Sequence, residues 1–440
     1  MTLNTRTALA AVLLALAAAP ALAAPLNAPA VRKAVDAQLD RDYPALDALY
    51  KDLHANPELG FQETATAAKL AREMRALGFT VTEGVGKTGV VAVLKNGDGP
   101  KILVRTELDA LPMEEKSGLP YASRARATWK GEEVFVAHAC GHDIHMAAWV
   151  GTARALIALK AQWKGTLVFV AQPSEETVSG ARAMLADGFI ERFGKPDYGF
   201  TLHVGGGPAG EIYYKPGVLT STSDGIDLTF HGRGGHGSMP SATIDPILMA
   251  SRFVVDVQSV ISREKDPGQF GVVTIGSIQA GSAGNIIPDR ARLRGTIRTQ
   301  DAGVRDKILA GVQRTVKAVV AMADAPPAEL TLTPGGKAVV NDAALTERTA
   351  VVFKAAFGAK AVLQTQPGSA SEDYSEFILA GVPSVYFGIG GFDPALVEAA
   401  RKDDKPLATN HSPYFAPTPE PTIRTGVEAM TLAVMNVAGK

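Results

Sequence analysis

The sequence predicts an α/β protein with a mainly parallel, mixed sheet, into which a smaller α+β domain is inserted. Three observations indicate this fold class. Short apolar runs alternate with helical patterns in the first half of the chain, the order changes to βαββαβ in the middle third, and the first pattern resumes towards the C-terminus. Strands that alternate with helices are typical of a parallel sheet whose strands are connected by helices.

The elements of the larger domain begin with a helical spacing of apolar residues over 31–77, which ends at Leu77-Gly78-Phe79. A second, long helical pattern covers about residues 143–160. The glycine-rich segment 84–89 joins two strand-like runs and opens no helix, so we expect a hairpin turn there and no phosphate loop. The remaining elements are strands at 90–94, 102–106, 166–171, 199–204 and 384–388, and helices at 343–357 and 374–379.

The middle third has the element order of a ferredoxin-like open sandwich, which is a self-contained unit. Its expected strands are 226–230, 272–278, 290–298 and 329–332, and its expected helices are 246–262 and 302–322. We therefore predict an inserted domain at 223–334 and a larger, discontinuous domain made of residues 24–222 and 335–440.

Composition and charge exclude several classes of protein. The chain has 440 residues with 44 Lys+Arg against 45 Asp+Glu and contains no basic run, which argues against nucleic acid as a partner. Cys140 is the only cysteine, so no intrachain disulfide can form.

The N-terminus, residues 1–23, has the pattern of a secretory signal peptide. Arg6 precedes an apolar run at 8–19, and the small residues that follow offer an A-x-A site with cleavage expected after Ala23. A membrane anchor is the alternative, although the run is shorter than the roughly 20 residues that span a bilayer. No cysteine lies near the cleavage site, so the protein is not a lipoprotein. We expect a secreted or periplasmic protein that is free of the membrane after cleavage.

The densest group of reactive side chains is the segment His138-Ala-Cys140-Gly-His142-Asp143-Ile-His145. Thiolate and imidazole are good ligands for a borderline-soft divalent metal, and the C-x-H spacing lets two of them converge where the backbone turns. Two other interpretations remain open. The histidines could be satisfied core residues, or Cys140 could be a catalytic nucleophile beside a histidine.

Acids and histidines also follow several of the predicted strands. Glu175 and Glu176 come directly after one strand, where one carboxylate could ligate a metal and the other act as general base; a solvated acidic loop is the alternative. His203 closes the next strand and Asp109 follows an earlier one, whereas His411 alone would rank as an ordinary loop histidine. Because ligands bind at the carboxyl ends of strands in open α/β sheets, these endings together indicate a metal-assisted hydrolase.

Five motifs occur in the order of a known family. They are His138-Ala-Cys-Gly-His-Asp143, Gln172-Pro-Ser-Glu-Glu176, Gly234-Gly-His-Gly237, Asn285-Ile-Ile-Pro288 and Ser371-Glu-Asp373. Together they resemble the amidohydrolase branch of the aminoacylase and carboxypeptidase metallopeptidases, peptidase family M20. That branch holds hippurate hydrolases, N-acyl-amino-acid amidohydrolases and auxin-conjugate hydrolases, and the likeness extends from about residue 54 to residue 411.

The resemblance implies a zinc-peptidase-like catalytic domain with two divalent metal ions per subunit. The implied ligands are Cys140, His142, Glu176, His203 and His411. Cys140 would stand where other branches of the family use a bridging aspartate, Glu175 would be the general base, and Asp109 would orient a ligand. Zinc or manganese is the expected metal, and cobalt or nickel also suits the ligand set.

The resemblance also implies that the inserted domain serves as a lid and dimerisation domain. His236 is similar to the family's lid histidine, which helps to stabilise the tetrahedral oxyanion and in some relatives comes from the partner subunit of a dimer. We therefore expect a homodimer through the inserted domain. Asn285 and Arg298 are candidates for binding the substrate carboxylate, with an edge-strand charge as the alternative for Arg298. Glu107 and Ser174 depart from the family's usual aspartate and alanine, which concerns specificity more than the reaction.

These inferences lead to one functional hypothesis. The protein is expected to be an exported, metal-dependent amidohydrolase that cleaves the amide bond of N-acyl or N-aroyl amino acids or small dipeptides, through a metal-activated water with Glu175 as general base. The alternatives are a periplasmic binding protein that kept the pocket without turnover and a cysteine-nucleophile hydrolase that uses Cys140.

Overall fold

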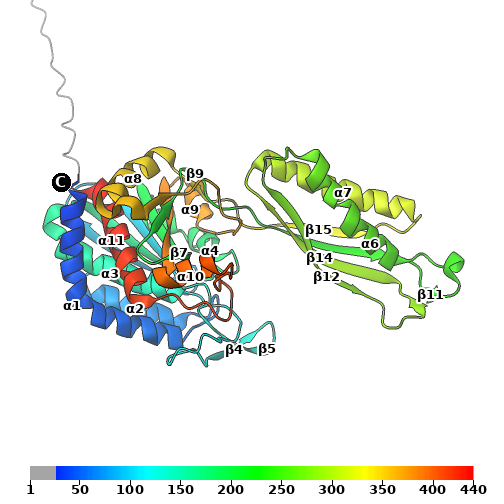
Figure 1. The fold of residues 1–440 in the computed structure, drawn as a ribbon, viewed down its shortest axis with the longest axis horizontal. Helices are drawn as coiled ribbons and strands as arrows, with labels where there is room; N and C mark the ends of the chain where they lie inside the picture. The colour runs from blue at the N-terminus through cyan, green and yellow to red at the C-terminus, as the bar shows by residue number, and fades with distance from the viewer. Residues whose placement is uncertain (1–25, 440) are drawn as a thin grey trace, which may run out of the picture.

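The computed structural model describes residues 26–439, which form two bodies joined by a narrow connection (Figure 1). Within these residues the larger body is built on an eight-stranded sheet in the order β1-β2-β6-β3-β7-β18-β8-β17. The central strands β6, β3, β7 and β18 are parallel, whereas β1–β2, β2–β6 and β18–β8 are antiparallel pairs. In sheet order the bounds are Thr80–Val85, Gly89–Asn96, Gly165–Gln172, Lys101–Glu107, Tyr198–Pro208, Ser384–Phe392, Ile212–Tyr214 and Ala361–Leu363.

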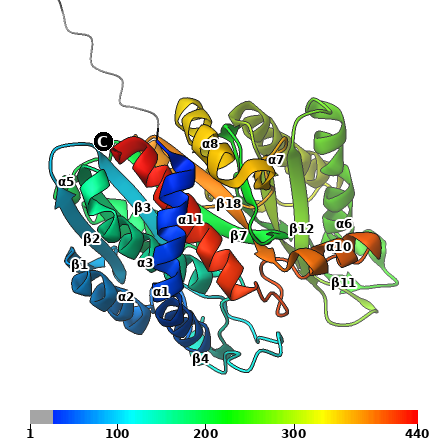
Figure 2. The same ribbon diagram turned by 60° about the vertical axis from the view of Figure 1, so that its left-hand side comes forward.

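Helices cover both faces of this sheet, as Figure 2 shows for the face under α1, α3 and α11. The alternation of side chains along a strand explains the two layers: in β2, Val90 and Ala92 enter one hydrophobic core and Val91 enters another. The helices over the first core are α1 (Ala28–Ala55), α2 (Thr64–Ala76), α3 (His142–Ala158), α8 (Ala343–Phe357) and α11 (Pro419–Ala438). Those over the second core are α4 (Gly180–Ala186), α5 (Phe189–Phe193) and α9 (Ser375–Leu379).

The smaller body is an antiparallel sheet in the order β12-β14-β10-β15 with two helices on one face. Its main elements are β10 (Asp224–His231), α6 (Pro246–Asp256), β12 (Gly271–Ala280), β14 (Arg290–Thr299), α7 (Ala302–Met322) and β15 (Glu329–Pro334). Its buried apolar side chains form a separate cluster around Phe230, Phe253 and Leu293. Where the bodies join, the Thr222 N–H donates to the carbonyl oxygen of Thr299 at 2.6 Å.

Several short elements complete the chain. They are the hairpin of β4 (Arg126–Trp129) and β5 (Glu132–Phe135), the pair β11 (Gly235–His236) and β13 (Ile286–Ile287), the pair β9 (Gly217–Val218) and β16 (Val340–Asn341), α10 (Pro394–Lys402), and single turns at Lys160–Gln162, Pro240–Ala242, Val260–Glu264 and Gly358–Lys360.

The predicted fold class is confirmed, with corrections to single elements. The glycine-rich segment forms the expected hairpin, because β1 and β2 pair antiparallel around it. The helical pattern over 31–77 is two helices, α1 and α2, separated by residues 56–63, and the helix expected at 246–262 ends at Asp256. Helix α11 is not among the predicted elements; most of its side chains are buried.

The predicted signal peptide at 1–23 lies outside the residues that the structure describes. Across residues 26–439, none of the helices has the length and apolar character that crossing a bilayer requires.

Candidate metal centre

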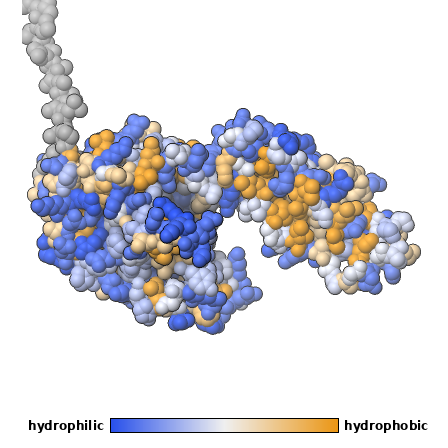
Figure 3. All heavy atoms as spheres, in the orientation of Figure 1, coloured by the Kyte–Doolittle hydropathy of each residue, from blue (hydrophilic) through white to orange (hydrophobic). Residues whose placement is uncertain are grey.

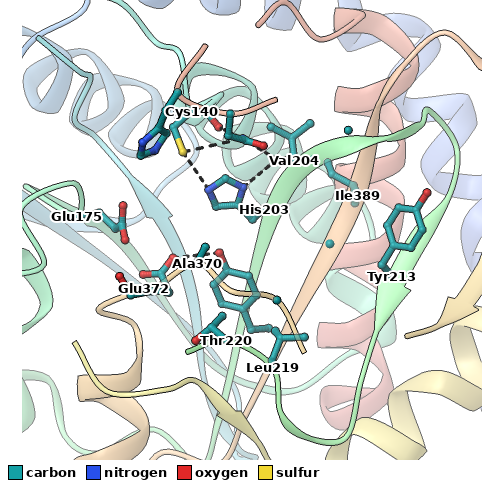
Figure 4. Close-up of a pocket in the computed structure, with 18 of the residues that line it drawn as sticks. Cys140, Glu175, His203, Val204, Tyr213, Leu219, Thr220, Ala370, Glu372 and Ile389 are labelled. Atoms are coloured by element: carbon teal, nitrogen blue, oxygen red, sulfur yellow. Dashed lines mark hydrogen bonds between the residues drawn. The ribbon is translucent and has the colours of Figure 1, made fainter. Parts of the chain in front are cut away.

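A cavity of about 850 Å³ opens at the carboxyl edge of the parallel strands (Figure 4). Its wall includes Cys140 from the segment before α3, Glu175 and Glu176 after β6, His203 in β7, and His411 between α10 and α11. These segments lie far apart in the sequence and converge here because the carboxyl ends of parallel strands share one edge of the sheet. The strand endings singled out in the sequence therefore surround one cavity.

The five predicted ligands fall into overlapping groups of neighbouring side chains. Three overlapping groups have their ligand atoms within 4.8 Å: Cys140, His142 and His203; Cys140, Glu176 and His411; and His142, Glu175 and Glu176. Cys140, His142 and Glu176 each belong to two of these groups, so the donor atoms of the five residues form one connected cluster. A donor set of sulfur, imidazole nitrogen and carboxylate oxygen suits borderline-soft divalent ions.

Backbone carbonyl groups fix the tautomers of two of these histidines. The Nδ1 of His142 lies 2.7 Å from the carbonyl oxygen of Asp109, and that of His203 lies 2.9 Å from the carbonyl oxygen of Val204. Because a carbonyl oxygen only accepts, each Nδ1 carries the proton and each Nε2 offers a lone pair to the cavity. The buried Nε2 of His142 has no hydrogen-bond partner among residues 26–439, and the Nε2 of His203 lies 3.4 Å from the Sγ of Cys140.

Asp109 holds the Glu176 segment against these histidines. Its Oδ2 accepts a hydrogen bond from the Glu176 backbone N–H at 2.9 Å, and its Oδ1 lies 3.6 Å from the Nδ1 of His142. The Oε2 of Glu176 lies 3.3 Å from the Nε2 of His411, whereas its buried Oε1 has no partner in the described part of the chain. The role predicted for Asp109, to orient a ligand, stays a prediction that this geometry supports.

Asn410, which the sequence analysis passes over, ties three segments of the site together. Its Nδ2 donates to the carbonyl oxygen of Cys140 at 3.0 Å and to that of Val204 at 3.1 Å, and lies 3.9 Å from the Sγ of Cys140. The next residue, His411, has a left-handed backbone with φ of 67°, and its N–H donates to the carbonyl oxygen of Ala139 at 2.8 Å. Its position directly before a predicted ligand is the signal that could have identified Asn410.

Glu175 lies beside the ligands with its carboxylate free of structural partners. Its Oε2 is 4.0 Å from the Nε2 of His142, and no side chain among residues 26–439 donates a hydrogen bond to it. Burial raises the pKa of Glu175 well above its ordinary value, and the carboxylates of Glu372 and Glu176 raise it further. A carboxylate with these properties is suited to accept a proton.

The charge of the pocket fits divalent cations. Burial lowers the pKa of His142, but its hydrogen bond with Asp109 and the carboxylate of Glu107 raise it more, to about 10. The acidic pocket therefore favours a positive charge at this ring, and a bound cation would be stabilised in the same way. Together with the unpartnered Nε2 of His142 and Oε1 of Glu176, this shows that the residues present fit a metal centre.

The structure separates the three site residues predicted in the smaller body. Arg298 lines the cavity and is half-buried. His236 and Asn285 are exposed at the opposite end of β14, where β11 pairs with β13. A strand rises about 3.4 Å per residue, so Arg290, at that end of β14, lies roughly 27 Å from Arg298. Within one chain, neither His236 nor Asn285 reaches the cavity.

The unusual Glu107 lies beneath the ligands, where it joins a buried ion cluster. Its Oε2 is 2.9 Å from the Nδ1 of His145, whose Nε2 accepts the Val204 N–H at 2.8 Å, so His145 is a satisfied core histidine. Its other oxygen pairs with Arg105, whose Nη2 donates to the Oε1 of Glu372 at 2.8 Å. The sequence analysis misses Arg105, although an arginine inside an apolar strand signals such a cluster.

The fold and this site together define a metal-dependent hydrolase of amide or peptide bonds. Its relationship to known proteins is direct: the sequence profile of peptidase family M20/M25/M40 matches residues 103–436, and the chain belongs to this family.

Individual relatives extend along most of the chain. The hippurate hydrolase of Campylobacter jejuni is 39% identical over 331 residues, covering 74% of this chain and 82% of its own, and the IAA-amino acid hydrolase ILR1-like 2 of Arabidopsis thaliana is 30% identical over 373 residues, covering 83% and 79%. The crystal structure of a dinuclear metal-binding M20 peptidase from Bacillus subtilis has a TM-score of 0.72 and 28% identity, covering 90% of this chain and 99% of that one.

Replacing Asn410 by Ala is predicted to weaken metal binding, because it removes the donor that joins the Cys140 and Val204 segments beside His411. We expect the dissociation constant for Zn²⁺ or Co²⁺ to rise about 10- to 100-fold, as for other residues that orient metal ligands. Competition with a chelator measures it. Thr409→Ala is the matched control, since no hydrogen bond of the Thr409 side chain occurs among the described residues; equal affinity of Asn410→Ala and wild type would contradict the prediction.

Proposed function

We propose that this protein is an exported amidohydrolase that cleaves the amide bond of N-acyl or N-aroyl amino acids or of small dipeptides. The observation that carries the proposal is the five-ligand cluster with the free carboxylate of Glu175 inside one cavity. Relatives named for hippurate hydrolysis and for hydrolysis of IAA-amino acids support this class of substrate.

Glu175 is the general base in the proposed reaction. When bound, a pair of divalent ions supplies a Lewis acid that polarises the amide carbonyl and acidifies water. The carboxylate of Glu175 takes a proton from the attacking water and delivers it to the leaving nitrogen. Its raised pKa favours acceptance of the proton, and its position next to His142 places it beside the ligand cluster.

Arg298 binds the carboxylate of the amino-acid half of the substrate. It reaches the cavity from the smaller body, and among residues 26–439 its side chain has one hydrogen bond, from Nη1 to the carbonyl oxygen of Ile297 at 3.4 Å. A guanidinium without a carboxylate partner is available for bidentate binding of a substrate carboxylate.

The smaller body forms a homodimer in this proposal, and His236 acts on the active site of the partner subunit. Figure 3 shows apolar residues gathered on the exposed face of this body, and Leu248, Ile278 and Ile286 are among its exposed large apolar side chains. Strand β12 lies at the edge of its sheet, where a second copy can pair. Asn285 lies beside His236 and would reach the partner's active site together with it.

The protein is secreted or periplasmic in this proposal, which rests on the signal pattern of residues 1–23. The mass of the exported chain tests it: cleavage after Ala23 supports it, and an uncleaved chain supports a membrane anchor. The native metal is zinc or manganese, for which metal analysis of the purified protein is the measurement.

Replacing Glu175 by Gln is predicted to lower kcat for N-benzoylglycine by about 10²- to 10⁴-fold, because the amide cannot accept the proton of the attacking water. Metal content, measured by elemental analysis, should equal that of the wild type, since Glu176 and the other ligands are intact. Near-wild-type turnover with metal bound would refute the role of Glu175. Glu347→Gln, at an exposed position of α8, is the matched control.

Removal of the metal is predicted to abolish hydrolysis, and its return should restore it. A cysteine-nucleophile hydrolase would keep its activity under chelation, which separates that alternative from the proposal. Burial and the neighbouring carboxylates of Glu176 and Glu175 raise the pKa of the Cys140 thiol, the opposite of what a thiolate nucleophile requires. Activity that survives complete chelation would favour the cysteine mechanism.

Mixing two inactive variants is predicted to restore activity if His236 acts on the partner's site. A mixed dimer contains one His236→Ala subunit and one Glu175→Gln subunit. One of its two sites then combines the intact Glu175 of the first subunit with the intact His236 of the second. Random exchange should therefore recover about a quarter of the wild-type rate, as expected for a two-fold symmetric dimer. No recovery after subunit exchange, verified by mass spectrometry, would exclude action across the interface.

A further inference from the structure

The backbone on both sides of Glu175 is held by buried carboxylates. The N–H of Ser174, the residue directly before Glu175, donates to the Oε1 of Glu63 at 2.7 Å. The N–H of Glu176, the residue directly after it, donates to the Oδ2 of Asp109 at 2.9 Å. Both accepting side chains are fully buried and come from different segments of the chain. The proposed general base therefore lies between two anchored N–H groups.

The position of Glu175 depends on this backbone. No side chain among residues 26–439 donates a hydrogen bond to its carboxylate, so the neighbouring peptide groups set where that carboxylate lies. Ser174 has a left-handed backbone with φ of 51°, which a residue other than glycine keeps only where its surroundings hold it. Among the described residues, Glu63 makes the side-chain hydrogen bond to Ser174 that comes from outside residues 173–180. It therefore holds a strained residue next to the general base.

The side chain of Glu63 does not cap the helix that it precedes. Glu63 is the N-cap residue of α2, but its side chain makes no capping hydrogen bond. Glu58 instead accepts the N–H groups of Thr66, at 2.7 Å, and of Ala65, at 3.2 Å. The Oε2 of Glu63 accepts the hydroxyl of Thr88 at 2.6 Å. The carboxylate thus links the turn between β1 and β2 to the segment after β6, and the start of α2 does not require it.

Glu63 is buried without a cation beside it. In the described part of the chain its two oxygen atoms accept from Thr88 and Ser174, and no Lys, Arg or His forms an ion pair with it. Burial and the charge of Asp109 raise the pKa of Glu63 to about 7. The carbonyl oxygen of a carboxylic acid or of an amide also accepts a hydrogen bond. The bond to Ser174 consequently requires the reach of this side chain and not its charge.

We propose that Glu63 is a positioning residue for the general base: its hydrogen bond to the N–H of Ser174 fixes the backbone before Glu175 and thereby places the carboxylate of Glu175 in the cavity. The inference rests on the proposed amidohydrolase function. Two tasks are separated within one loop, because Glu63 holds the side of the general base and Asp109 holds the side of the metal ligand. Loss of the Glu63 side chain should therefore lower turnover without loss of metal.

Three substitutions separate the reach of Glu63 from its charge. Glu63→Gln keeps the reach and removes the charge, Glu63→Asp keeps the charge and is shorter by one methylene group, and Glu63→Ala removes both. Thr88→Val is the matched control, because it removes the other hydrogen bond of the same carboxylate. For each holoenzyme, kcat and KM for N-benzoylglycine, metal content and thermal unfolding are measured, with kinetics at a temperature at which all variants are folded.

Glu63→Ala and Glu63→Asp are expected to lower kcat by about 10- to 100-fold, the effect of a small displacement of a reacting group. Their KM and metal content should stay within about threefold of the wild type. Glu63→Gln should restore kcat to within about threefold, and Thr88→Val should show no larger loss. The opposite order, with Glu63→Asp active and Glu63→Gln impaired, would overturn the inference, because the charge and not the reach would then matter.

A double variant distinguishes positioning from a general loss of structure. If Glu63 acts through Glu175, Glu63→Ala should lower kcat no further when Glu175→Gln is already present. An equal fold loss with and without Glu175→Gln would overturn the inference, since a damaged enzyme loses activity whichever residue stands at position 175. If Glu63→Ala does not fold, Glu63→Asp takes its place in this comparison.

Hydrogen exchange gives a readout that does not require turnover. The amide of Ser174 should exchange about tenfold faster or more in Glu63→Ala than in the wild type, and at the wild-type rate in Glu63→Gln. Unchanged exchange in Glu63→Ala would overturn the inference. If the wild type hydrolyses no N-acyl amino acid, the proposed function fails, and hydrogen exchange still decides whether Glu63 anchors Ser174.

Discussion

A single buried arginine holds the floor of the site in place. The side chain of Arg105 is fully buried in the middle of the main sheet and is surrounded by the carboxylates of Glu107, Glu372 and Asp373. Burial and the charge of Glu372 raise the pKa of Asp373 to about 8. The guanidinium of Arg105 therefore does not balance the negative charge of all three carboxylates. Removing one partner from such a cluster leaves an uncompensated buried charge, which typically costs about 3–5 kcal/mol.

The hydrogen bonds of this cluster lead directly to the metal ligands. From Arg105 the contacts pass through Glu107 to His145, and from His145 to the N–H of Val204. Val204 then accepts hydrogen bonds from the ring of His203 and, through the same carbonyl oxygen, from the side chain of Asn410. The excess of buried carboxylate thus has two consequences: it orients the ligands, and it makes the cavity above them a place where added positive charge is stabilised.

The sequence predicts those parts of the site that follow from local pattern. The Cys140–His142 segment and the Glu175–Glu176 pair are recognisable because reactive side chains at strand and helix ends are rarely structural, and the structure brings them together. Asn410 escapes notice because the segments that it joins lie more than 200 residues away in the chain. Arg105 escapes notice because two of its three carboxylate partners, Glu372 and Asp373, lie more than 260 residues away. In the fold, α8 is predicted with its observed bounds, whereas the largely buried α11 is not among the predicted elements.

The geometry of the hinge limits how the two bodies can cooperate. The cavity borders the hinge, since Thr220, Ser223 and Arg298 line it and Thr299 is hydrogen-bonded to Thr222. The smaller body has its own hydrophobic core, so a rigid rotation of this body about the connection between the two bodies would keep its far end at a fixed distance from that connection. His236 lies at the far end of this body, beyond Arg290, and Arg290 is itself roughly 27 Å from Arg298 along β14, more than the reach of a side chain. Closure of a single chain can therefore tilt Arg298 over the substrate but cannot deliver His236 to it. If His236 takes part in the reaction, it must do so at another chain's cavity, and the exposed edge of β12 is where the two chains would have to be held in register.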